Sequence, residues 1–439
     1  MFCGRPSIRR FSFGSMNISW LLQIAYLAFT SNALLVERGS LRANGIRKPI
    51  AVDSTRPRLS WRLISSKRGD DQTGYRIQAS GSDGPWALPD LWDSGRIKSA
   101  DNTAVYNGED LNSRSMVFWR VRVWDSQGRP SDWSETSTFE VSLLEQSDWK
   151  ASWITNRDYS PGNNSLPVFA KEFNVACTPT KARLYLLGLG VHAPEINGEV
   201  VGDSVLAPGY STLNKTALYS TYDITNQVHQ GENVLGVALG KGIYQADKPL
   251  GGRYTKLVVA EEELKLVSQL EYTCPSGDTQ TILSDNSWTT SVQGPHLESH
   301  WYGGEEYDAR KEIPDWSKTS GKRDGWTNAS ITTGPSGVLV SPRAPQMKVV
   351  DTFEAVAVKQ AGSQWVFDFG VNFAGTFPLK VNGEGVRIQD FPRIQLKGLI
   401  PDVTSAPESA LCFIPRKSLM RPEVLTSVPP RARYSMPIL

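Results

Sequence analysis

The strongest constraint on the fold is a short-range alternation of apolar and polar residues. In the segment VFWRVRVW, Trp119, Val121 and Val123 form one row, and Arg120 and Arg122 lie between them. A period of two is that of a β-strand with one face packed inward and the other outward. Similar short runs recur between turn residues, and no long stretch has a sustained apolar period of 3.6. The sequence therefore predicts an all-β chain of packed sandwiches.

Length and charge set the broad class. The chain has 439 residues, of which 39% are hydrophobic, enough for about three domains with a core each. The net charge is +2, and acidic and basic residues are interspersed. This pattern predicts no nucleic-acid partner.

Residues 34–145 are predicted to form a fibronectin-III-like β-sandwich. Strand-like runs separated by turns follow one another over about 100 residues, which is typical of that fold. The runs are TGYRIQAS (73–80), LWDSGRI (91–97), VFWRVRVW (117–124) and TSTFEV (136–141).

Residues 146–335 are predicted to form a jelly-roll-like, carbohydrate-binding-like domain. Strand-like runs continue there, and the pair Asn197-Gly198 is the strongest short-range signal for a hairpin turn. Residues 336–385 are predicted to be the start of a third, truncated β-domain. Alternation fades after that, and 386–439 is predicted to be an unstructured tail.

The N-terminus is predicted to be a secretory signal peptide, residues 1–33. Three arginines precede the apolar run 18–29, and Ser31-Asn32-Ala33 offers the small residues of a cleavage site. The alternative is a buried strand or helix. We expect a secreted, extracellular protein that has no membrane contact after cleavage. Sequons at Asn163, Asn214 and Asn328 are glycosylation candidates.

The four cysteines form no C-x-x-C pair, which argues against a zinc ribbon or a redox motif. In an oxidising compartment Cys177 and Cys274 can pair. Their separation in sequence says nothing about geometry, so the pairing stays open.

The segment HWYGGEEYDAR (300–310) carries the candidate site residues. On a strand, Glu306 and Asp308 would share a face about 6–7 Å apart, near the spacing of an inverting carboxylate pair. In the alternative, structural interpretation, Arg310 forms a bidentate ion pair with Glu306 or Asp308. A third interpretation has Trp301 or Tyr302 stacking on a sugar ring, with Glu306, Asp308 and Arg310 as further carbohydrate contacts.

Seven segments in order resemble the N-terminal region of secreted α-L-rhamnosidases, glycoside hydrolase family 78. The resemblance covers about residues 41–384. The segments are PRLSWRL, VFWRVRVWD, INGEVVGDSVLAPGYSTLNK, YSTYDIT, ENVLGVALGKGIY, GGEEYDAR and DFGVNFAGTFPLKV.

The resemblance implies that the full-length enzyme hydrolyses terminal α-L-rhamnose from glycosides. It also implies that the catalytic acid and base lie in an (α/α)6 barrel beyond the β-domains. The likeness stops near Gly383, so we expect a truncated chain that has no catalytic residue and is inactive alone. Whether the chain is an enzyme is thus open, and the alternative is a stand-alone secreted carbohydrate-binding β-protein. The expected partners are rhamnose-containing glycans or glycosides.

No cofactor is expected, but calcium is possible because some family members carry a rhamnose-binding module that uses it. The oxygen-rich loops are Asp203-Ser204, Asp285-Asn286 and Asp247 near Gly251-Gly252. None has EF-hand spacing, so ordinary polar turns are the alternative and the metal ligands stay unassigned.

Overall fold

The computed structural model describes residues 34–84, 86–245, 263–300, 304–361, 364–371, 395–396 and 435–438. The elements in these ranges are β-strands and two short 3₁₀ helices, which confirms the all-β prediction. Within the same ranges, no helix has the length and apolar character needed to cross a membrane. The predicted signal peptide, residues 1–33, lies outside the described residues.

Packing divides the chain into two compact units. One contains the described residues up to Ala43, together with Arg58–Glu109 and Val117–Thr138. The other contains Asn44–Pro57, Asp110–Met116 and the described residues from Phe139 onward.

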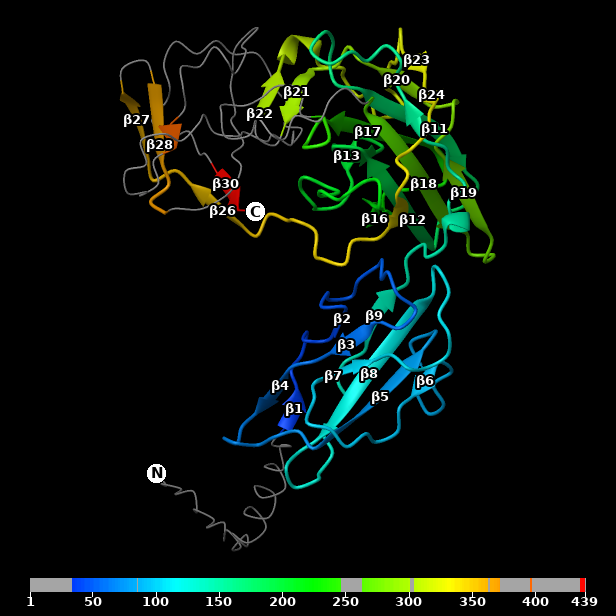
Figure 1. Cartoon of the computed structure of the whole chain (residues 1–439), viewed down its shortest axis with the longest axis vertical. Coiled ribbons are helices and arrows are strands. Elements are labelled where there is room, and N and C mark those ends of the chain that lie inside the picture. Colours follow the sequence, from blue (N-terminus) through cyan, green and yellow to red (C-terminus); the bar gives the residue numbers. More distant parts are fainter. Residues whose placement is uncertain are drawn as a thin grey trace, which may run out of the picture. The chain divides into compact units, whose positions relative to one another are not determined.

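The first unit is a β-sandwich. Its fibronectin-III-like type stays a prediction. Its strands are β1 (Leu34–Val36), β2 (Arg42–Ala43), β3 (Arg58–Ser60), β4 (Leu63–Ser65), β5 (Gly74–Ser80), β6 (Trp92–Asp93), β7 (Thr103–Val105), β8 (Met116–Trp124) and β9 (Ser137–Glu140). The first residue of β8 and the last two residues of β9 belong to the second unit. The sheets are β2-β3-β7 and β6-β5-β8-β9, with β1 paired to β4. Figure 1 shows β5 and β8 side by side, and they pair antiparallel from Gly74↔Trp124 to Ser80↔Phe118.

The two faces of β8 follow the predicted alternation. Trp119, Val121 and Val123 are fully buried. On the other face, the guanidinium groups of Arg120 and Arg122 lie 4.4 and 4.3 Å from the ring centre of Trp133. The arginines thus face outward as expected, but they stack on an aromatic ring instead of standing free in water.

The second unit is a double sheet, with six strands in each sheet among the described residues. One sheet has the order β16-β12-β18-β10-β24 with β19 on β18, and the other has the order β14-β13-β17-β11-β20-β23. The first contains β10 (Ile154–Thr155), β12 (Lys181–Gly188), β16 (Ser220–Asp223), β18 (Lys265–Thr273), β19 (Thr279–Leu283) and β24 (Ser330–Ile331). The second contains β11 (Val168–Val175), β13 (Val191–Ile196), β14 (Glu199–Val200), β17 (Gly231–Gly240), β20 (Thr289–Ser291) and β23 (Thr327–Asn328).

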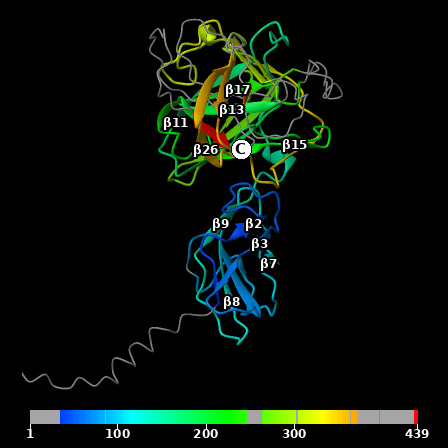
Figure 2. The same cartoon turned by 90° about the vertical axis from the view of Figure 1, so that its left-hand side faces the viewer.

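The core of this unit lies between the two sheets. Buried side chains from both belong to one apolar cluster, among them Leu184 and Leu270 from the first sheet and Phe169 and Val237 from the second. Figure 2 shows β13 and β17 of the second sheet side by side, and they pair antiparallel from Val191↔Gly240 to Ile196↔Leu235. Such burial is the main stabilising term for a double sheet.

The predicted hairpin at Asn197-Gly198 is confirmed. These two residues join β13 to β14, and their φ angles are 53° and 83°. Both lie in the left-handed region, which an Asn-Gly pair adopts at low cost in a two-residue hairpin turn.

A disulfide joins Cys177 to Cys274, with 5.9 Å between the Cα atoms. Cys177 lies two residues after the end of β11, and Cys274 directly follows β18. The bridge therefore ties a strand of one sheet to a strand of the other and settles the pairing that the sequence left open.

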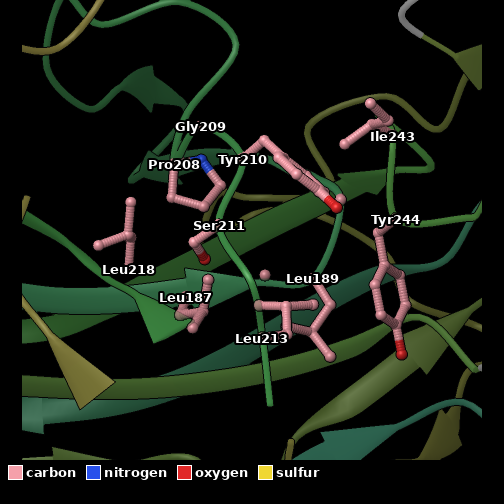
Figure 3. Close-up of a pocket in the computed structure, with 12 residues that line it drawn as sticks. Leu187, Leu189, Pro208, Gly209, Tyr210, Ser211, Leu213, Leu218, Ile243 and Tyr244 are labelled. Atoms are coloured by element: carbon pink, nitrogen blue, oxygen red, sulfur yellow. The ribbon is translucent and has the colours of Figure 1, made fainter. Parts of the chain in front are cut away.

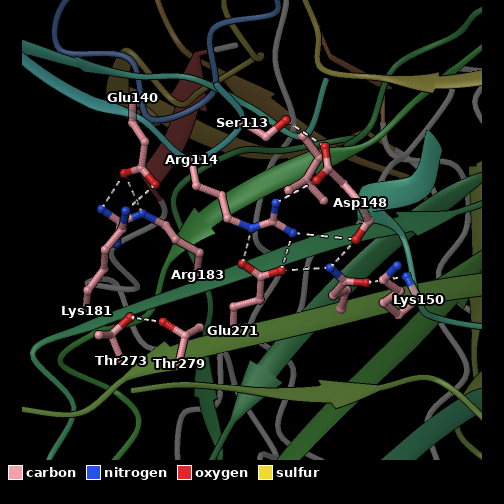
Figure 4. A network of polar contacts seen from close by, with 12 residues as sticks. Ser113, Arg114, Glu140, Asp148, Lys150, Lys181, Arg183, Glu271, Thr273 and Thr279 are labelled. Atoms are coloured by element: carbon pink, nitrogen blue, oxygen red, sulfur yellow. Dashed lines mark hydrogen bonds and ion pairs between the residues drawn. The ribbon is translucent and has the colours of Figure 1, made fainter. Parts of the chain in front are cut away.

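A network of partly buried ion pairs also belongs to this unit (Figure 4). Arg114 donates to both carboxylate oxygens of Glu271 at 2.7 Å and to Asp148 at 2.8 Å. Glu140, 1% exposed at its side chain, accepts from Arg183 at 2.9 Å and pairs with Lys181 at 2.7 Å. Hydrogen bonds from two sides fix Arg114, and the Glu271 carboxylate raises its pKa.

Short elements complete the unit. They are η1 (Gln146–Asp148), β15 (Thr216–Leu218), β21 (His296–His300), β22 (Gly304–Tyr307), η3 (Ala309–Lys311), β25 (Val338–Val340), β26 (Asp351–Glu354), β27 (Ala357–Ala361), β28 (Gln364–Asp368), β29 (Gln395–Leu396) and β30 (Ser435–Ile438). Within the predicted tail, 386–439, two strands are described: β29 pairs with β28, and β30 pairs with β26. The rest of the tail lies outside the described residues, so its lack of a core stays a prediction.

Candidate functional site

The segment that carries the predicted site residues forms the hairpin β21-β22. Glu298 pairs with Glu306 and His296 with Tyr307, with a bulge between these two pairs. Trp301 and Tyr302, the predicted stacking residues, lie outside the described part of the chain. Glu306 is half-buried.

Asp308 and Arg310 form the bidentate ion pair of the structural interpretation. Arg310 Nε donates to Asp308 Oδ1 at 2.8 Å, and Nη2 donates to Oδ2 at 2.7 Å. Asp308 is 3% exposed and also caps η3, because its Oδ1 accepts from the backbone N–H of Arg310 at 3.2 Å. The chain turns at Asp308 into this 3₁₀ helix, so the partner of Arg310 is Asp308 and not Glu306. A carboxylate held in this way serves the local fold.

Two further polar contacts hold the hairpin, and no local pattern in the sequence pointed to them. Glu305 Oε1 lies 2.6 Å from His296 Nδ1, and the Glu305 side chain is 2% exposed. The buried Lys241, just after β17, lies 2.7 Å from Glu298 Oε2. These pairs join residues 9 and 57 positions apart, which only the tertiary fold brings together.

A second candidate site is a pocket at the end of β12, with a volume of about 200 Å³ (Figure 3). Three segments far apart in sequence form it: the turn after β12, the loop between β14 and β15, and the residues after β17. The lining residues are Leu187, Gly188, Leu189, Gly190, Pro208, Gly209, Tyr210, Ser211, Leu213, Leu218, Ile243 and Tyr244.

A buried histidine supports the floor of this pocket. The Gly188 N–H donates to His192 Nδ1 at 3.1 Å, and His192 Nε2 lies 3.1 Å from the hydroxyl of Tyr222. Because Nδ1 accepts, the ring proton lies on Nε2. Burial lowers the pKa of His192 to about 3, so the ring is neutral at physiological pH. Gly188 must lack a side chain, since a Cβ there would lie 2.9 Å from the Cβ of His192.

The open side of the pocket carries an aromatic ring and hydroxyl groups. Tyr210 is 62% exposed. In the described part of the chain, neither the Tyr210 nor the Ser211 hydroxyl makes a hydrogen bond to protein. Leu187 and Leu189 are buried beneath them. Chemically, the arrangement suits a small ligand that has one apolar side and several hydroxyl groups.

The proposed calcium loops have other partners where they are described. Asp203 pairs with Lys348 at 2.7 Å, and Asp285 accepts from the backbone N–H of Ser287 at 2.8 Å. The loop at Asp247 and Gly251-Gly252 lies outside the described residues. No cluster of three or more His, Cys, Asp or Glu side chains suited to a metal occurs in the described ranges. A calcium site therefore stays a prediction without assigned ligands.

Residues 39–145 match the family model for the Rha78A-like, N-terminal immunoglobulin domain, and residues 177–351 match that for the alpha-L-rhamnosidase N-terminal domain. The chain resembles the N-terminal region of the α-L-rhamnosidase family. This confirms the resemblance drawn from the seven sequence segments.

Individual proteins that are similar to this chain are also α-L-rhamnosidases. An α-L-rhamnosidase of Formosa agariphila is 32% identical over 371 residues, which cover 77% of this chain and 38% of the relative. An α-L-rhamnosidase of an Alteromonas species is 31% identical, with 85% of this chain and 42% of the relative covered. The crystal structure of the Aspergillus terreus α-L-rhamnosidase superposes with a TM-score of 0.72 at 31% identity, covering 80% of this chain and 40% of that one. The chain thus spans about two-fifths of the length of these α-L-rhamnosidases.

Both candidate sites lie in the range that matches the alpha-L-rhamnosidase N-terminal domain model. The matched range 177–351 includes the β21-β22 hairpin and all residues that line the pocket. The three pocket segments lie at loops between strands of one sandwich, where binding residues are commonly found.

Proposed function

We propose that this chain is the non-catalytic N-terminal β region of a secreted glycoside hydrolase that removes terminal α-L-rhamnose from glycosides. The observation that carries the proposal is the match of both units to N-terminal domains of α-L-rhamnosidases, at 31–32% identity to relatives more than twice as long. The substrates would be rhamnose-containing glycosides or glycans.

The chemistry of the described carboxylates supports a non-catalytic role. Inverting hydrolysis needs one carboxylic acid to protonate the leaving oxygen and one carboxylate to activate water. Asp308, one of the two predicted candidates, is bound on both oxygens by Arg310. A carboxylate in a bidentate ion pair is stabilised as the anion and is a poor proton donor. The acid and base would therefore come from another part of the enzyme.

The test compares residues 34–439 with the complete Formosa agariphila relative on an aryl α-L-rhamnoside. We expect the relative to release the aryl group and the chain to show no turnover above the buffer blank. Turnover by the chain that is lost in Glu306→Gln or Asp308→Asn would contradict the proposal. The proposal also requires that the chain is part of a longer hydrolase. Sequencing the transcript beyond the codon for Leu439 tests this requirement, since a helical barrel must be encoded there.

A stand-alone carbohydrate-binding protein is the second candidate. The observation that favours it is the pocket, with its exposed Tyr210 and with Tyr210 and Ser211 hydroxyls that have no protein partner among the described residues. A stop codon directly after Leu439 in the transcript, together with sugar binding by the chain, would support this candidate over the first.

Three observations support the proposal that the protein is exported. The N-terminus has the composition of a signal peptide, and the Cys177–Cys274 disulfide is of a kind that persists in oxidising compartments. The three sequon asparagines, Asn163, Asn214 and Asn328, are all exposed. N-terminal sequencing of secreted protein should find a start near Ala33, and a mature chain that retains residues 18–29 would contradict export by cleavage.

A further inference from the structure

We propose that the outer face of the β6-β5-β8-β9 sheet in the first unit binds the sulfate or carboxylate groups of an anionic polysaccharide. The binding surface is an arginine face, formed by Arg76, Arg120 and Arg122 around Trp133. The proposal rests on the proposed function only for the extracellular setting, whereas the surface itself comes from the contacts on this sheet. It would anchor the chain to a charged polymer, separately from the hydrolysis of rhamnosides.

The pairing of β5 with β8 places arginines opposite each other. Arg120 and Arg122 lie on the outer side of β8, away from its buried row. Across the ladder, Arg76 of β5 pairs with Arg122, and Gln78 pairs with Arg120. Like charges directly opposite each other on one face of a sheet repel. An oxyanion that contacts both Arg76 and Arg122 would relieve this repulsion.

The ring of Trp133 gathers the three guanidinium groups into one cluster. Their central carbons lie 4.4 Å (Arg120), 4.3 Å (Arg122) and 5.9 Å (Arg76) from the centre of the ring. The ring of Trp86 lies 4.6 Å from the Arg120 group. Stacking holds a guanidinium group without using its N–H donors, so these donors stay available for a ligand.

The segment that carries Trp133 is fixed along β8. The Ser131 N–H donates to the carbonyl oxygen of Val123 at 2.8 Å, and the Ser131 hydroxyl accepts from the Val123 N–H at 3.1 Å. Ser134 makes the same two contacts with Val121, at 2.8 and 3.0 Å. The cluster is therefore built into the fold, and a ligand would not have to order it.

Protein groups neutralise the positive charge of the arginine face only in part. Arg76 forms a bidentate ion pair with Asp93, at 2.8 and 2.5 Å. Arg120 donates to the neutral side-chain oxygen of Gln78, at 3.1 and 2.8 Å. Among the described residues, Arg122 makes no hydrogen bond or ion pair, and its Nε is buried without an acceptor. Two of the three guanidinium groups thus have no carboxylate in contact.

The electrostatic surroundings of these two groups favour an anion. Burial and then the neighbouring arginines lower the pKa of Arg120 and of Arg122, and the carboxylates of Asp93 and Asp132 oppose this shift only in part. Both guanidinium groups stay charged at neutral pH. A guanidinium group is weakly hydrated and donates in a fork that matches carboxylate and sulfate oxygens, so it can exchange water for an oxyanion at low cost.

The stacking favours a polysaccharide over a nucleic acid. Single-stranded nucleic acids bind by stacking their bases on exposed aromatic rings, but guanidinium groups already lie over Trp133 and Trp86. An anionic polysaccharide needs no free ring, because its charged groups bind the N–H donors of the arginines. Residues on one face of a strand recur at about 6–7 Å, so the row can contact successive charged groups of an extended polymer.

The test measures binding of the full chain to three polymers that share one backbone: dextran sulfate, carboxymethyl dextran and neutral dextran. We expect binding to at least one charged polymer and none to neutral dextran, and added salt should weaken the binding. The charged polymer that binds more tightly identifies the preferred oxyanion. No binding to either charged polymer, as for stacking that only stabilises the sheet, would overturn the proposal. Tighter binding to single-stranded DNA than to both charged polymers would also overturn it.

Variants locate the surface. Arg122→Gln should weaken binding to the charged polymer about five- to tenfold, and Arg122→Lys, which keeps the charge, should weaken it less. The matched control is Arg62→Gln, which removes the same charge from the same unit. Arg62 pairs with Glu37 at 2.8 Å and lies outside this sheet, so the control should bind like the parent chain. Folding of each variant is checked by circular dichroism, and equal weakening by folded Arg122→Gln and Arg62→Gln would contradict the proposal.

This proposal and the hydrolase proposal can fail separately. If the transcript encodes a barrel but the chain binds neither charged polymer, only the arginine face falls. If the chain binds a charged polymer through Arg122 but no barrel is encoded, the hydrolase proposal falls and the arginine face stands.

Discussion

The buried His192 should make the second unit less stable as the solution becomes mildly acidic. The imidazole is 7% exposed, accepts from the Gly188 N–H at Nδ1, and has its pKa lowered by burial to about 3. In the unfolded chain the same ring titrates near pH 6.5. Below pH 6.5 the imidazole is protonated in the unfolded state but not in the folded state. The free energy of unfolding therefore decreases as the pH falls from 6.5 toward 3.

The size of this effect follows from the two pKa values. At pH 7.5 both states are almost fully deprotonated, and the histidine contributes nothing to the pH dependence. At pH 5 the unfolded state gains about 2 kcal/mol from protonation, while the folded state gains almost nothing. With a urea m-value of about 2 kcal/mol/M, the unfolding midpoint should fall by about 1 M between these pH values.

The assay compares the parent chain with His192→Asn and His229→Asn. Asn at position 192 can still accept the Gly188 N–H but cannot be protonated, so this variant should lose the histidine contribution to the pH dependence. It should also be about 1–3 kcal/mol less stable at pH 7.5, because the contact to Tyr222 is lost. His229 is exposed and serves as the control. Urea unfolding at pH 7.5 and 5.0, followed by hydrogen exchange of β12 and β17 peptides, reports on this unit alone.

The reasoning would be refuted if His192→Asn lost as much stability between pH 7.5 and 5.0 as the parent. An NMR titration gives a second check. The ring signals of His192 should not move between pH 7.5 and 4.5, and a midpoint near 6.5 would show that the ring is protonated in the folded protein.

Three further perturbations test other parts of the structure. Reduction of the Cys177–Cys274 disulfide, which closes a loop of 97 residues, should lower the free energy of unfolding by about 2–5 kcal/mol, and an unchanged urea midpoint would count against a structural bridge. Glu140→Ala should lower the free energy of unfolding by about 3–5 kcal/mol, because Arg183 then stays buried without that carboxylate. The control Asp110→Ala removes a carboxylate that is 86% exposed and should lower the free energy of unfolding by about 1 kcal/mol or less. Trp133→Ala should lower the thermal midpoint of the first unit more than Trp133→Phe does, because only alanine removes the ring on which the arginines stack, and equal losses would show that stacking contributes little.

Local patterns in the sequence were enough for the fold class and for several elements. The alternation around Trp119 predicts β8 and its buried face, because a strand sends successive side chains to opposite sides. The Asn197-Gly198 pair predicts the turn between β13 and β14, because these residues accept positive φ. Each of these patterns lies within a few neighbouring residues, so the strand and the turn can be predicted without knowledge of the tertiary structure.

The candidate site could be predicted only in part. The sequence drew attention to Asp308 and Arg310 and allowed either Glu306 or Asp308 as the partner of Arg310. Only the 3₁₀ turn at 309–311 decides for Asp308, since it places that carboxylate against both the guanidinium and the backbone N–H. No local pattern pointed to the pocket, because Leu187, Tyr210 and Tyr244 come from three separate segments.

What the sequence determined by itself is thus the period of its strands, its strongest turn and its family resemblance. What only the tertiary structure decided is which distant residues meet. Cys177 forms a disulfide with Cys274 because β11 and β18, which belong to different sheets, end close to each other. His192 becomes a neutral, buried base because Gly188 leaves room for its ring and the Tyr222 hydroxyl contacts it from β16, a strand of the other sheet. Burial and pairing depend on packing between sheets, and a period of two along one strand carries no information about the strand that will lie opposite.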